Sequence, residues 1–318
     1  MGLKIVSTGI AVPEKTVTNN DIAQFLDTSD DWIVSKTGIK QRAVATRESL
    51  TDLAFKAAVS ALKGADLAAS DMDFIICSTI LGDYTSPSLA CAVSERLKTI
   101  CPAFDINAAC TGFIYALSMA QAYIDSGAAA NILIISADML SSLVDWTDRA
   151  VCVLFGDGAG ACVVTRGNSL KYMKLAAYGD TSVIRQRNGT GNNPFSAHAS
   201  KGEFMTMEGQ EVFRFAVNAI EREVNSAFSA LNITSSDINY FMLHQANKRI
   251  IDSARKRLSL PEEKFPVNID KYGNTSSASI PILLNEMLEG GKIKKGDNLL
   301  LTAFGAGLTT GTCVLNWE

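Results

Sequence analysis

The chain alternates apolar runs of strand length with Ala- and Leu-rich runs of helical length, and this alternation constrains the fold most. Such alternation is typical of α/β architecture, in which helices and strands pack in layers. The order also recurs, because runs at 74–79, 132–137 and 160–165 are followed later by runs at 240–243, 299–303 and 311–316. Glycine-rich turns precede the last run of each set. We therefore predict two similar α/β halves that meet near residues 167 and 168.

The composition is that of a soluble enzyme with a large core. The chain has 318 residues, 47% of them hydrophobic, which suffices for one large or two medium domains. A formal net charge of −4 argues against nucleic-acid binding. No apolar run reaches the roughly 18 residues of a transmembrane helix, and the first residues have the pattern of a strand rather than a signal peptide. We expect a cytoplasmic protein that binds neither membrane nor nucleic acid.

One of the seven cysteines has the surroundings of a nucleophile. An odd number without a CxxC pair argues against a disulfide framework or a metal site such as zinc, and favours a reducing compartment. Cys110 follows small and apolar residues and precedes a stretch with the pattern of a buried helix. Because a helix start favours the thiolate, we expect a lowered pKa and a reactive Cys110. The alternative is a buried structural cysteine.

The chain has only two histidines, so a catalytic cysteine has few partners. His244 ends an apolar run with the pattern of a buried strand. A side chain in that position faces the crevice in which open α/β sheets bind ligands. His198 lies in a polar stretch without periodicity, and we interpret it as a loop residue. Asn274 precedes an apolar helix expected from Ile280 onward, and either caps that helix or belongs to the same site.

Four short segments are similar to the motifs of one enzyme family. They are 105–113 (DINAACTGF), 244–247 (HQAN), 273–276 (GNTS) and 304–307 (FGAG). In this order they resemble the active-site motifs of the β-ketoacyl-acyl-carrier-protein synthase III family, and the similarity runs from end to end, including 28–33 (TSDDWI), 37–39 (TGI) and 155–161 (FGDGAGA). The resemblance implies a thiolase-like fold with α/β/α/β/α layers. Its halves are residues 1–167, with Cys110, and 168–318, with His244 and Asn274.

The family implies an acyltransferase that initiates fatty acid biosynthesis by decarboxylative Claisen condensation. An acyl group moves from coenzyme A to Cys110, and malonyl-acyl carrier protein is then decarboxylated to give the carbanion that forms a 3-oxoacyl-acyl carrier protein. A covalent thioester splits one difficult step into two. His244 and Asn274 would donate hydrogen bonds to the malonyl thioester oxygen and stabilise the enolate. The resemblance implies a homodimer and no cofactor, since coenzyme A is a substrate.

The family also implies an oxyanion hole formed by the backbone N–H groups of Cys110 and Ala306. The chain departs from the family pattern here. It has Gly305-Ala306-Gly307 where most members have three glycines, and Leu308 where an aromatic residue is common. A backbone donor is retained if the φ angle of Ala306 is negative. If φ is positive, the methyl group costs about 1 kcal/mol or more.

The glycine-rich stretch 156–160 (GDGAG) invites comparison with nucleotide-binding loops. It lacks the spacing of a Rossmann fingerprint and the Lys-Ser/Thr pair of a P-loop, and it follows a strand without clearly opening a helix. We interpret its glycines as a tight turn between strands.

The segment 248–257 (KRIIDSARKR) carries five basic residues and one acidic residue on an expected helix. Solvated helix charges are the default interpretation. Its position beside the His244 motif instead favours docking of an acidic acyl carrier protein and its phosphopantetheine by electrostatic steering. The residues predicted to take part are Lys248, Arg249, Arg255, Lys256 and Arg257.

For coenzyme A, the resemblance points to Trp32 as a stacking surface for adenine, to Arg149 as its partner, and to Lys36 and Asn247. Lys36 stands where the family often has arginine, so bidentate phosphate contact is lost although the charge remains. In the family, a wall of the acyl pocket comes from the neighbouring subunit. Acetyl-specific members often have phenylalanine where this chain has Ser86, so we predict a roomier pocket and longer or branched primers.

Three alternatives remain open. The departures at Ser86, Ala306 and Leu308 leave room for a specialised-metabolism paralogue that transfers acyl groups to another acceptor. A non-catalytic partner subunit would keep the fold and the basic helix, but the intact catalytic motifs count against it. A cysteine thioesterase would use His244 as a general base oriented by Asn274. Hydrolysis needs a water route to the thioester, whereas condensation needs a dry pocket and a malonyl donor.

Overall fold

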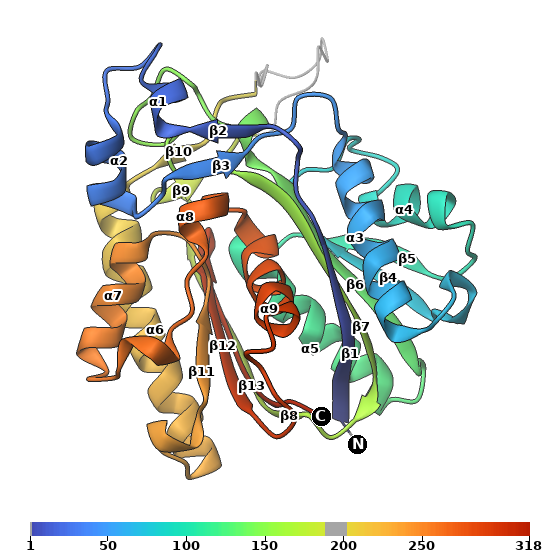
Figure 1. Ribbon diagram of the computed structural model, residues 1–318. Helices are drawn as coiled ribbons and strands as arrows, with labels where there is room; N and C mark the ends of the chain where they lie inside the picture. The colour runs from blue at the N-terminus through green and yellow to red at the C-terminus, as the bar shows by residue number, and fades with distance from the viewer. Residues whose placement is uncertain (1, 188–201) are drawn as a thin grey trace.

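Two β-sheets form the frame of the molecule (Figure 1). The computed structural model describes residues 2–187 and 202–318. The first sheet consists, in spatial order, of β1 (Gly2–Ala11), β7 (Asp157–Gly167), β6 (Asn131–Met139), β4 (Phe74–Ser78) and β5 (Ala103–Ile106). The second consists of β11 (Tyr240–Leu243), β12 (Asn298–Gly305), β13 (Gly307–Asn316) and β8 (Leu170–Asp180). Shorter pairs are formed by β2 (Thr16–Thr18) with β3 (Gln41–Ala43) and β9 (Ile184–Arg185) with β10 (Thr206–Met207).

Helices lie between the sheets and on their outer faces (Figure 1). The central layer contains α5 (Gly112–Asp125) and α9 (Ser279–Glu289). The outer layers contain α3 (Leu50–Ala65) and α4 (Leu89–Leu97) on the first sheet, and α6 (Gly209–Leu231) and α7 (Lys248–Arg257) on the second. This α/β/α/β/α arrangement confirms the predicted fold class.

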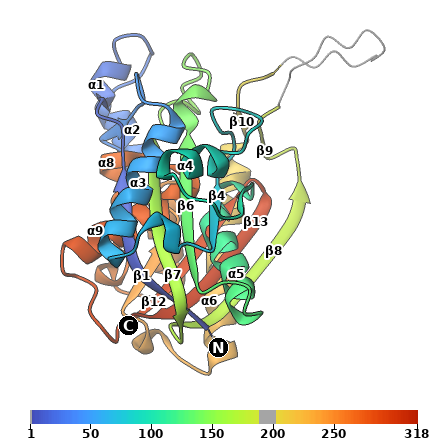
Figure 2. The same ribbon diagram turned by 90° about the vertical axis from the view of Figure 1, so that its right-hand side faces the viewer.

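Short helical segments connect these layers. The α-helical ones are α1 (Asn19–Ile22), α2 (Asp30–Thr37) and α8 (Ile269–Tyr272). Single 3₁₀ turns are η1 (Ala69–Asp71), η2 (Ala109–Thr111), η3 (Leu140–Ser142), η4 (Ser235–Asp237), η5 (Glu262–Lys264) and η6 (Ser276–Ala278). β1 begins and β13 ends at one end of the molecule, and α1, α2 and α8 lie at the other (Figures 1 and 2).

The two sheets repeat one topology. In each, two neighbouring strands are parallel, β4 with β6 and β11 with β12, and the first sheet has one more strand, β5, parallel to β4 at its edge. An antiparallel strand follows, β7 or β13, and a second antiparallel strand, β1 or β8, completes the order. The six strand-length runs of the sequence analysis lie in β4, β6, β7, β11, β12 and β13, so those predicted strands are confirmed.

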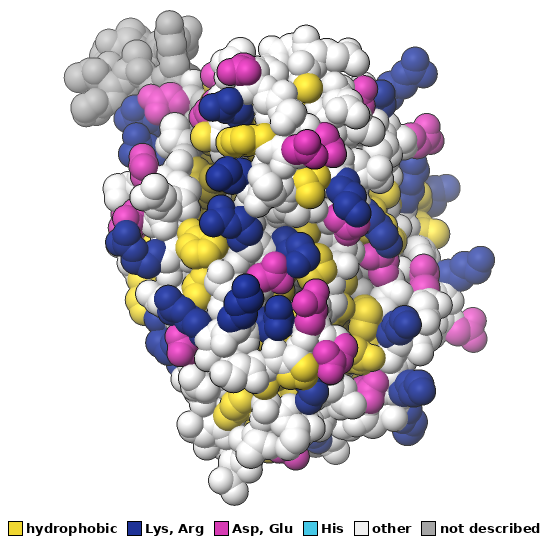
Figure 3. Space-filling model, turned by 60° about the vertical axis from the view of Figure 1, so that its left-hand side comes forward, with side chains coloured by type: hydrophobic (Ala, Val, Ile, Leu, Met, Phe, Trp, Pro, Cys, Tyr) yellow, Lys and Arg dark blue, Asp and Glu magenta, His cyan; other side chains and the backbone are white. Residues whose placement is uncertain are grey.

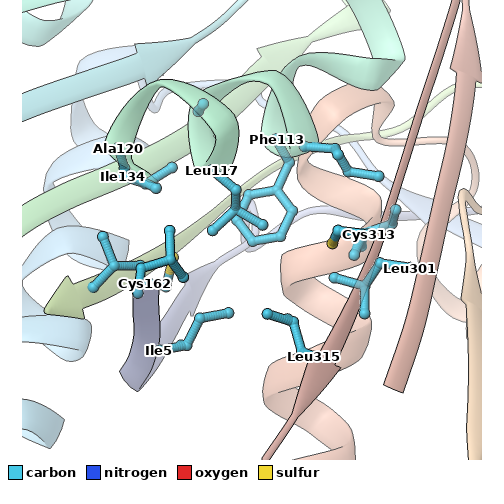
Figure 4. Close-up of a cluster of buried hydrophobic side chains, with 14 of the residues drawn as sticks. Ile5, Phe113, Leu117, Ala120, Ile134, Cys162, Leu301, Cys313 and Leu315 are labelled. Atoms are coloured by element: carbon cyan, nitrogen blue, oxygen red, sulfur yellow. The ribbon is translucent and has the colours of Figure 1, made fainter. Parts of the chain in front are cut away.

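The central core is formed by α5, α9 and the facing sides of both sheets. Phe113 and Leu117 of α5 lie between Ile134 of the first sheet and Leu301 of the second (Figure 4). Both central helices are covered by sheets on two sides, which is why they are apolar nearly all round. Each fully buried side chain of this size contributes about 1.5–3 kcal/mol relative to exposure.

The glycines at 156–160 do not form a tight turn, and that interpretation is wrong. β7 begins at Asp157, so most of these residues are already in a strand. A Cβ atom on Gly160 would lie 2.8 Å from the Cβ of Pro281, and one on Gly158 would lie 3.1 Å from Cδ1 of Ile282. The glycines therefore allow α9 to pack closely on β7.

None of the helices in the described part of the chain is both long and apolar enough to cross a membrane. His198, predicted to lie in a loop, falls outside the described residues.

We expect Gly9→Ala to destabilise the protein by about 1–3 kcal/mol, because an added methyl group overpacks a tight contact. A Cβ atom on Gly9 would overlap the backbone of Ala57 and Ala61, where β1 packs on α3. The measurement is the midpoint of denaturant unfolding. The matched control is Gly209→Ala, since a Cβ atom there has no neighbour within 4 Å. Equal midpoints for the two variants would contradict the packing argument.

Candidate active site

A cavity of about 800 Å³ is lined by residues from segments that connect the strands and helices of both halves. Cys110, His244 and Asn274 all line it. They come from η2, from the end of β11 and from the segment that precedes η6. A second cavity of about 270 Å³ also reaches Cys110 and shares Ala306 with the first. The cysteine therefore lies where two cavities meet, with room for a ligand on each side.

Cys110 lies in the turn η2, two residues before α5 begins. Its predecessor Ala109 has a φ angle of 47°, in the left-handed region that residues with side chains seldom adopt. The Asn107 Oδ1 atom supports this turn by accepting a hydrogen bond from the Ala109 N–H at 3.2 Å. A Cβ atom on Gly305 would lie 2.9 Å from the Cys110 backbone nitrogen, so the end of β12 abuts the cysteine.

The surroundings of Cys110 favour the neutral thiol. Burial raises the pKa of the Cys110 thiol to about 12, and the nearby Asp138 carboxylate acts in the same direction. The Ser276 hydroxyl opposes this rise by donating a hydrogen bond to the Cys110 sulfur at 3.6 Å. The predicted lowering of this pKa is wrong, because the loss of hydration outweighs the nearby helix start. Cys110 therefore needs a proton acceptor when it reacts.

His244 is held as a neutral ring. Burial lowers the pKa of His244 to about 3. Its Nδ1 atom lies 2.6 Å from Oγ of Ser279, and the same oxygen accepts a hydrogen bond from the Gln245 N–H at 3.3 Å. We infer that the Ser279 hydroxyl donates to Nδ1, because Nδ1 is the one acceptor within hydrogen-bond distance of that hydroxyl among the described residues. The network thus assigns the proton of the ring to Nε2, which becomes a hydrogen-bond donor.

Asn274 is anchored through its backbone to the segment before β7. Its N–H donates to the Leu154 carbonyl at 2.9 Å, and its carbonyl accepts from the Gly156 N–H at 3.1 Å. The side-chain Oδ1 accepts a hydrogen bond from the Ser276 N–H at 2.9 Å, which leaves the Nδ2 amide to donate into the cavity. Asn274 does not cap α9, whose N-cap position is Ala278.

Ala306 occupies the turn between β12 and β13 and lines both cavities. Ala306 is not one of the described non-glycine residues with a positive φ angle, so its methyl group causes no backbone strain. The next residue, Gly307, has a φ angle of 136°, which requires glycine. Leu308 is buried and lines the larger cavity. The replacement of glycine by Ala306 is therefore compatible with a backbone donor at this position.

The residues predicted for coenzyme A lie around the larger cavity. Trp32, Lys36 and Asn247 line it. The Arg149 guanidinium lies 4.9 Å from the centre of the Trp32 ring and donates to the Asp27 carbonyl at 2.7 Å. Asn247 caps α7 by accepting from the Arg249 N–H at 2.8 Å, and donates to the Lys36 carbonyl at 3.1 Å. Asn247 thus ties α2 to α7.

The basic residues of α7 do not form one uniform surface. Arg249 and Arg257 line the larger cavity, and Lys256 is exposed. Lys248 pairs with Asp252 at 2.8 Å, and Arg255, whose side chain is only 19% exposed, lies 3.4 Å from a Glu262 carboxylate oxygen. Figure 3 shows this side of the molecule, where Lys and Arg side chains surround recessed hydrophobic ones.

The predicted Ser86 does not line the site of the single chain, whereas several residues that were not predicted lie at it. Ser86 is exposed and lines neither cavity. The sequence analysis did not single out Ser276, Ser279 or Asp138, although the serines belong to the polar run that follows Asn274. Arg214 of α6, also not singled out, lines the larger cavity. In the described ranges 2–187 and 202–318, no cluster of three His, Cys, Asp or Glu side chains is placed to hold a metal ion.

Comparisons with known proteins agree with this geometry. Residues 104–180 match the family described as 3-oxoacyl-[acyl-carrier-protein (ACP)] synthase III, and residues 228–317 match its C-terminal region. The β-ketoacyl-[acyl-carrier-protein] synthase III of Aquifex aeolicus is 43% identical over 321 residues, which cover 100% of both chains. The chain belongs to the β-ketoacyl-acyl-carrier-protein synthase III family. The predicted family is confirmed.

Solved structures of this family share the fold. That of 3-oxoacyl-[acyl-carrier-protein] synthase III from Aquifex aeolicus superimposes with a TM-score of 0.92 at 42% identity, covering 99% of this chain and 100% of the other. The priming β-ketosynthase of the R1128 polyketide pathway gives a TM-score of 0.91 at 28% identity, covering 100% of this chain and 97% of the other. The fold is thus the thiolase-like fold of this synthase III family.

We expect His244 to stay neutral, with its proton on Nε2, between about pH 5 and about pH 8, because its lowered pKa lies below that range. Isotope labelling of the histidine ring nitrogens gives only two sets of NMR signals, since the chain has two histidines. A His244→Gln variant assigns them, and Ser279→Ala should mix the tautomers. A His244 signal that titrates near pH 6.5, its ordinary pKa, would contradict this assignment.

We expect Gly305→Ala to slow acylation of Cys110 by about 100-fold, the usual effect of a displacement of roughly 1 Å at a reacting group. The added Cβ atom would lie 2.9 Å from the Cys110 nitrogen and push η2 away from β12. The control is Ala306→Gly, which keeps the backbone donor and should retain most of the rate. Acylation is followed as release of coenzyme A in a single turnover. A Gly305→Ala enzyme with the rate of the parent would contradict this reasoning.

Proposed function

We propose that the chain condenses an acyl-coenzyme A primer with malonyl-acyl carrier protein to give a 3-oxoacyl-acyl carrier protein, the first condensation of fatty acid biosynthesis. The observation that carries the proposal is the junction of the two cavities at Cys110. The smaller cavity offers space for an acyl chain, and the larger cavity contains two neutral hydrogen-bond donors, His244 Nε2 and Asn274 Nδ2. Family membership supports the same reaction.

In the first half-reaction, the Cys110 sulfur attacks the carbonyl carbon of the primer. The carbonyl oxygen gains negative charge and accepts hydrogen bonds from the backbone N–H groups of Cys110 and Ala306. The bond between the carbonyl carbon and the coenzyme A sulfur then breaks. The thiol proton ends on the departing sulfur, so the products are the Cys110 thioester and free coenzyme A.

In the second half-reaction, the malonyl group loses its carboxylate as carbon dioxide. The electron pair of the broken bond forms an enolate, whose oxygen accepts hydrogen bonds from His244 Nε2–H and Asn274 Nδ2–H. The enolate carbon attacks the carbonyl carbon of the Cys110 thioester, and the carbon–sulfur bond breaks. Cys110 leaves as a thiolate, which takes up one proton from solvent to regenerate the neutral thiol. Neutral donors suit this step, because they stabilise the enolate oxygen without protonating it.

The outer part of the larger cavity suits the two substrates that share a phosphopantetheine arm. We assign Trp32 and Arg149 to the adenine of coenzyme A, and Lys36 and Asn247 to the rest of the molecule. The carrier protein, which is acidic, would dock on α7, with the basic residues in the roles predicted above: Lys248, Arg249, Arg255, Lys256 and Arg257. The exposed Lys256 and the cavity-lining Arg249 and Arg257 are best disposed for such contacts.

The proposal includes a cytoplasmic homodimer. Ser86 is exposed and outside both cavities of the single chain, which fits a residue that borders the acyl pocket of a neighbouring protomer. We also propose that the chain divides into halves 1–167 and 168–318. The end of β7 at Gly167 and the start of β8 at Leu170 support this division.

The alternatives have weaker support. A specialised paralogue is favoured only by the departures at Ser86, Ala306 and Leu308, and identity is lower to the R1128 priming enzyme, 28%, than to the Aquifex synthase III, 43%. A thioesterase needs a ring nitrogen that accepts a proton from water. The hydrogen bond from Ser279 directs the lone pair of His244 away from the cavity, so the ring serves as a donor.

Intact-protein mass spectrometry after incubation with acetyl-, isobutyryl- and hexanoyl-coenzyme A tests this function. We expect one acyl group per chain and its absence in Cys110→Ala, because the thioester forms on that sulfur. We further expect the isobutyryl and hexanoyl adducts to form at least as fast as the acetyl adduct, because Ser86 is small. A parent enzyme that forms no adduct would overturn the function, and strict acetyl preference would overturn the primer prediction alone.

A further inference from the structure

A buried carboxylate lies behind the nucleophile and has no role in the reaction described above. Asp138, at the carboxyl end of β6, is only 1% exposed. Its Oδ1 atom accepts from the Ile80 N–H at 2.7 Å and from the Thr79 hydroxyl at 3.3 Å. Its Oδ2 atom accepts from the Ser277 hydroxyl at 2.9 Å. These partners are neutral, so hydrogen bonds rather than an ion pair hold the carboxylate next to the site.

Ser276 connects this carboxylate to the cysteine. Its hydroxyl donates a hydrogen bond to the Cys110 sulfur at 3.6 Å, and it also lies close enough to the Asp138 carboxylate to lower the pKa of that group. The backbone of Ser276 has a φ angle of 52°, and its N–H is held by Asn274 Oδ1. The hydroxyl carries a single proton, so when it turns this proton from the sulfur to Asp138, its oxygen can accept the thiol proton.

We propose that Ser276 and Asp138 together accept the thiol proton of Cys110 during acyl transfer. As the sulfur electron pair forms the bond to the acyl carbon, the S–H proton moves to the Ser276 oxygen and the Ser276 proton moves to Asp138. When the bond to the coenzyme A sulfur breaks, a proton returns along the same path to that sulfur. Ser276 touches the reacting atom, and Asp138 acts through it. The inference rests on the proposed function.

This assignment leaves His244 free for the second half-reaction. With its proton on Nε2, the ring donates to the malonyl oxygen and has no lone pair toward the cavity. Burial raises the pKa of Asp138 to about 6, whereas burial lowers that of His244 to about 3, so the carboxylate holds a proton more readily. Around Asp138, the segment after β4 contributes Thr79 and Ile80, η6 contributes the two serines, and η2 contributes the titratable Cys110.

The first test is the pH dependence of the acyl-transfer rate in the parent enzyme, measured as single-turnover release of coenzyme A. A proton acceptor with a pKa of about 6 predicts a constant rate above about pH 7 and a fall of about tenfold per pH unit well below pH 6. A rate that instead rises tenfold per pH unit up to about pH 9 would mean that solvent removes the proton. A rate that stays unchanged as the pH falls to about 4.5 would point to His244 as the proton acceptor. Either result overturns the proposal.

The second test separates the half-reactions in variants. Ser276→Ala and Asp138→Asn should slow acyl transfer by about 100-fold or more, the usual contribution of general base catalysis. Ser276→Gly should do the same, and it relieves the left-handed backbone. Enzyme already carrying an acyl group should still condense with malonyl-acyl carrier protein within about threefold of the parent rate. Asp138→Asn should also lose the fall in rate below about pH 6.

Ser277→Ala is the matched control, because Ser277 donates to Asp138 without touching the sulfur. Its acyl-transfer rate should fall by less than about tenfold. Equal slowing of both half-reactions, or equal effects of Ser276→Ala and Ser277→Ala, would show a structural role and overturn the proposal. If Asp138→Asn does not fold, the Ser276 variants and the parent pH profile still decide. Failure of the proposed function differs, since the parent enzyme would then form no acyl adduct.

Discussion

The close packing of α5 and α9 between the two sheets is the constraint on which the site depends. Glycines allow both helices to approach the first sheet closely: a Cβ atom on Gly112 of α5 would overlap Oγ of Ser78 in β4, and one on Gly160 of β7 would lie 2.8 Å from Pro281 of α9. As a result, the turns that precede the two helices, η2 and η6, lie against each other. The nucleophile of one half and the polar run of the other thereby reach the same cavity.

This burial also determines the charge state of the site. Removal of water raises the pKa of Cys110 and lowers that of His244, so both groups are neutral near neutral pH. Neutral groups suit condensation, because an imidazolium would protonate the carbanion that has to attack. The same burial requires a separate acceptor for the thiol proton. The two half-reactions thus place different demands on one site, and two sets of side chains meet them.

Much of the fold and the central site could be predicted from the sequence. Sequence patterns predicted the strand-length runs. They also predicted Cys110, His244 and Asn274, because each of these residues lies beside a recognisable element or motif. The positions of Ser276, Ser279 and Asp138 were not predicted, because their importance comes from distances between segments far apart in the chain. The pKa of Cys110 was predicted in the wrong direction, since a sequence shows a helix start but not the loss of water. The roles of the surface residues, Ser86 included, stay predictions.

The central claim is that the chain forms a carbon–carbon bond rather than hydrolysing a thioester. The most direct measurement is the time course of coenzyme A release from a primer, with malonyl-acyl carrier protein first omitted and then added. The account predicts a burst of one coenzyme A per chain, a stop, and then steady release with one carbon dioxide for each coenzyme A. Steady release before any malonyl donor is added would contradict it and identify a thioesterase.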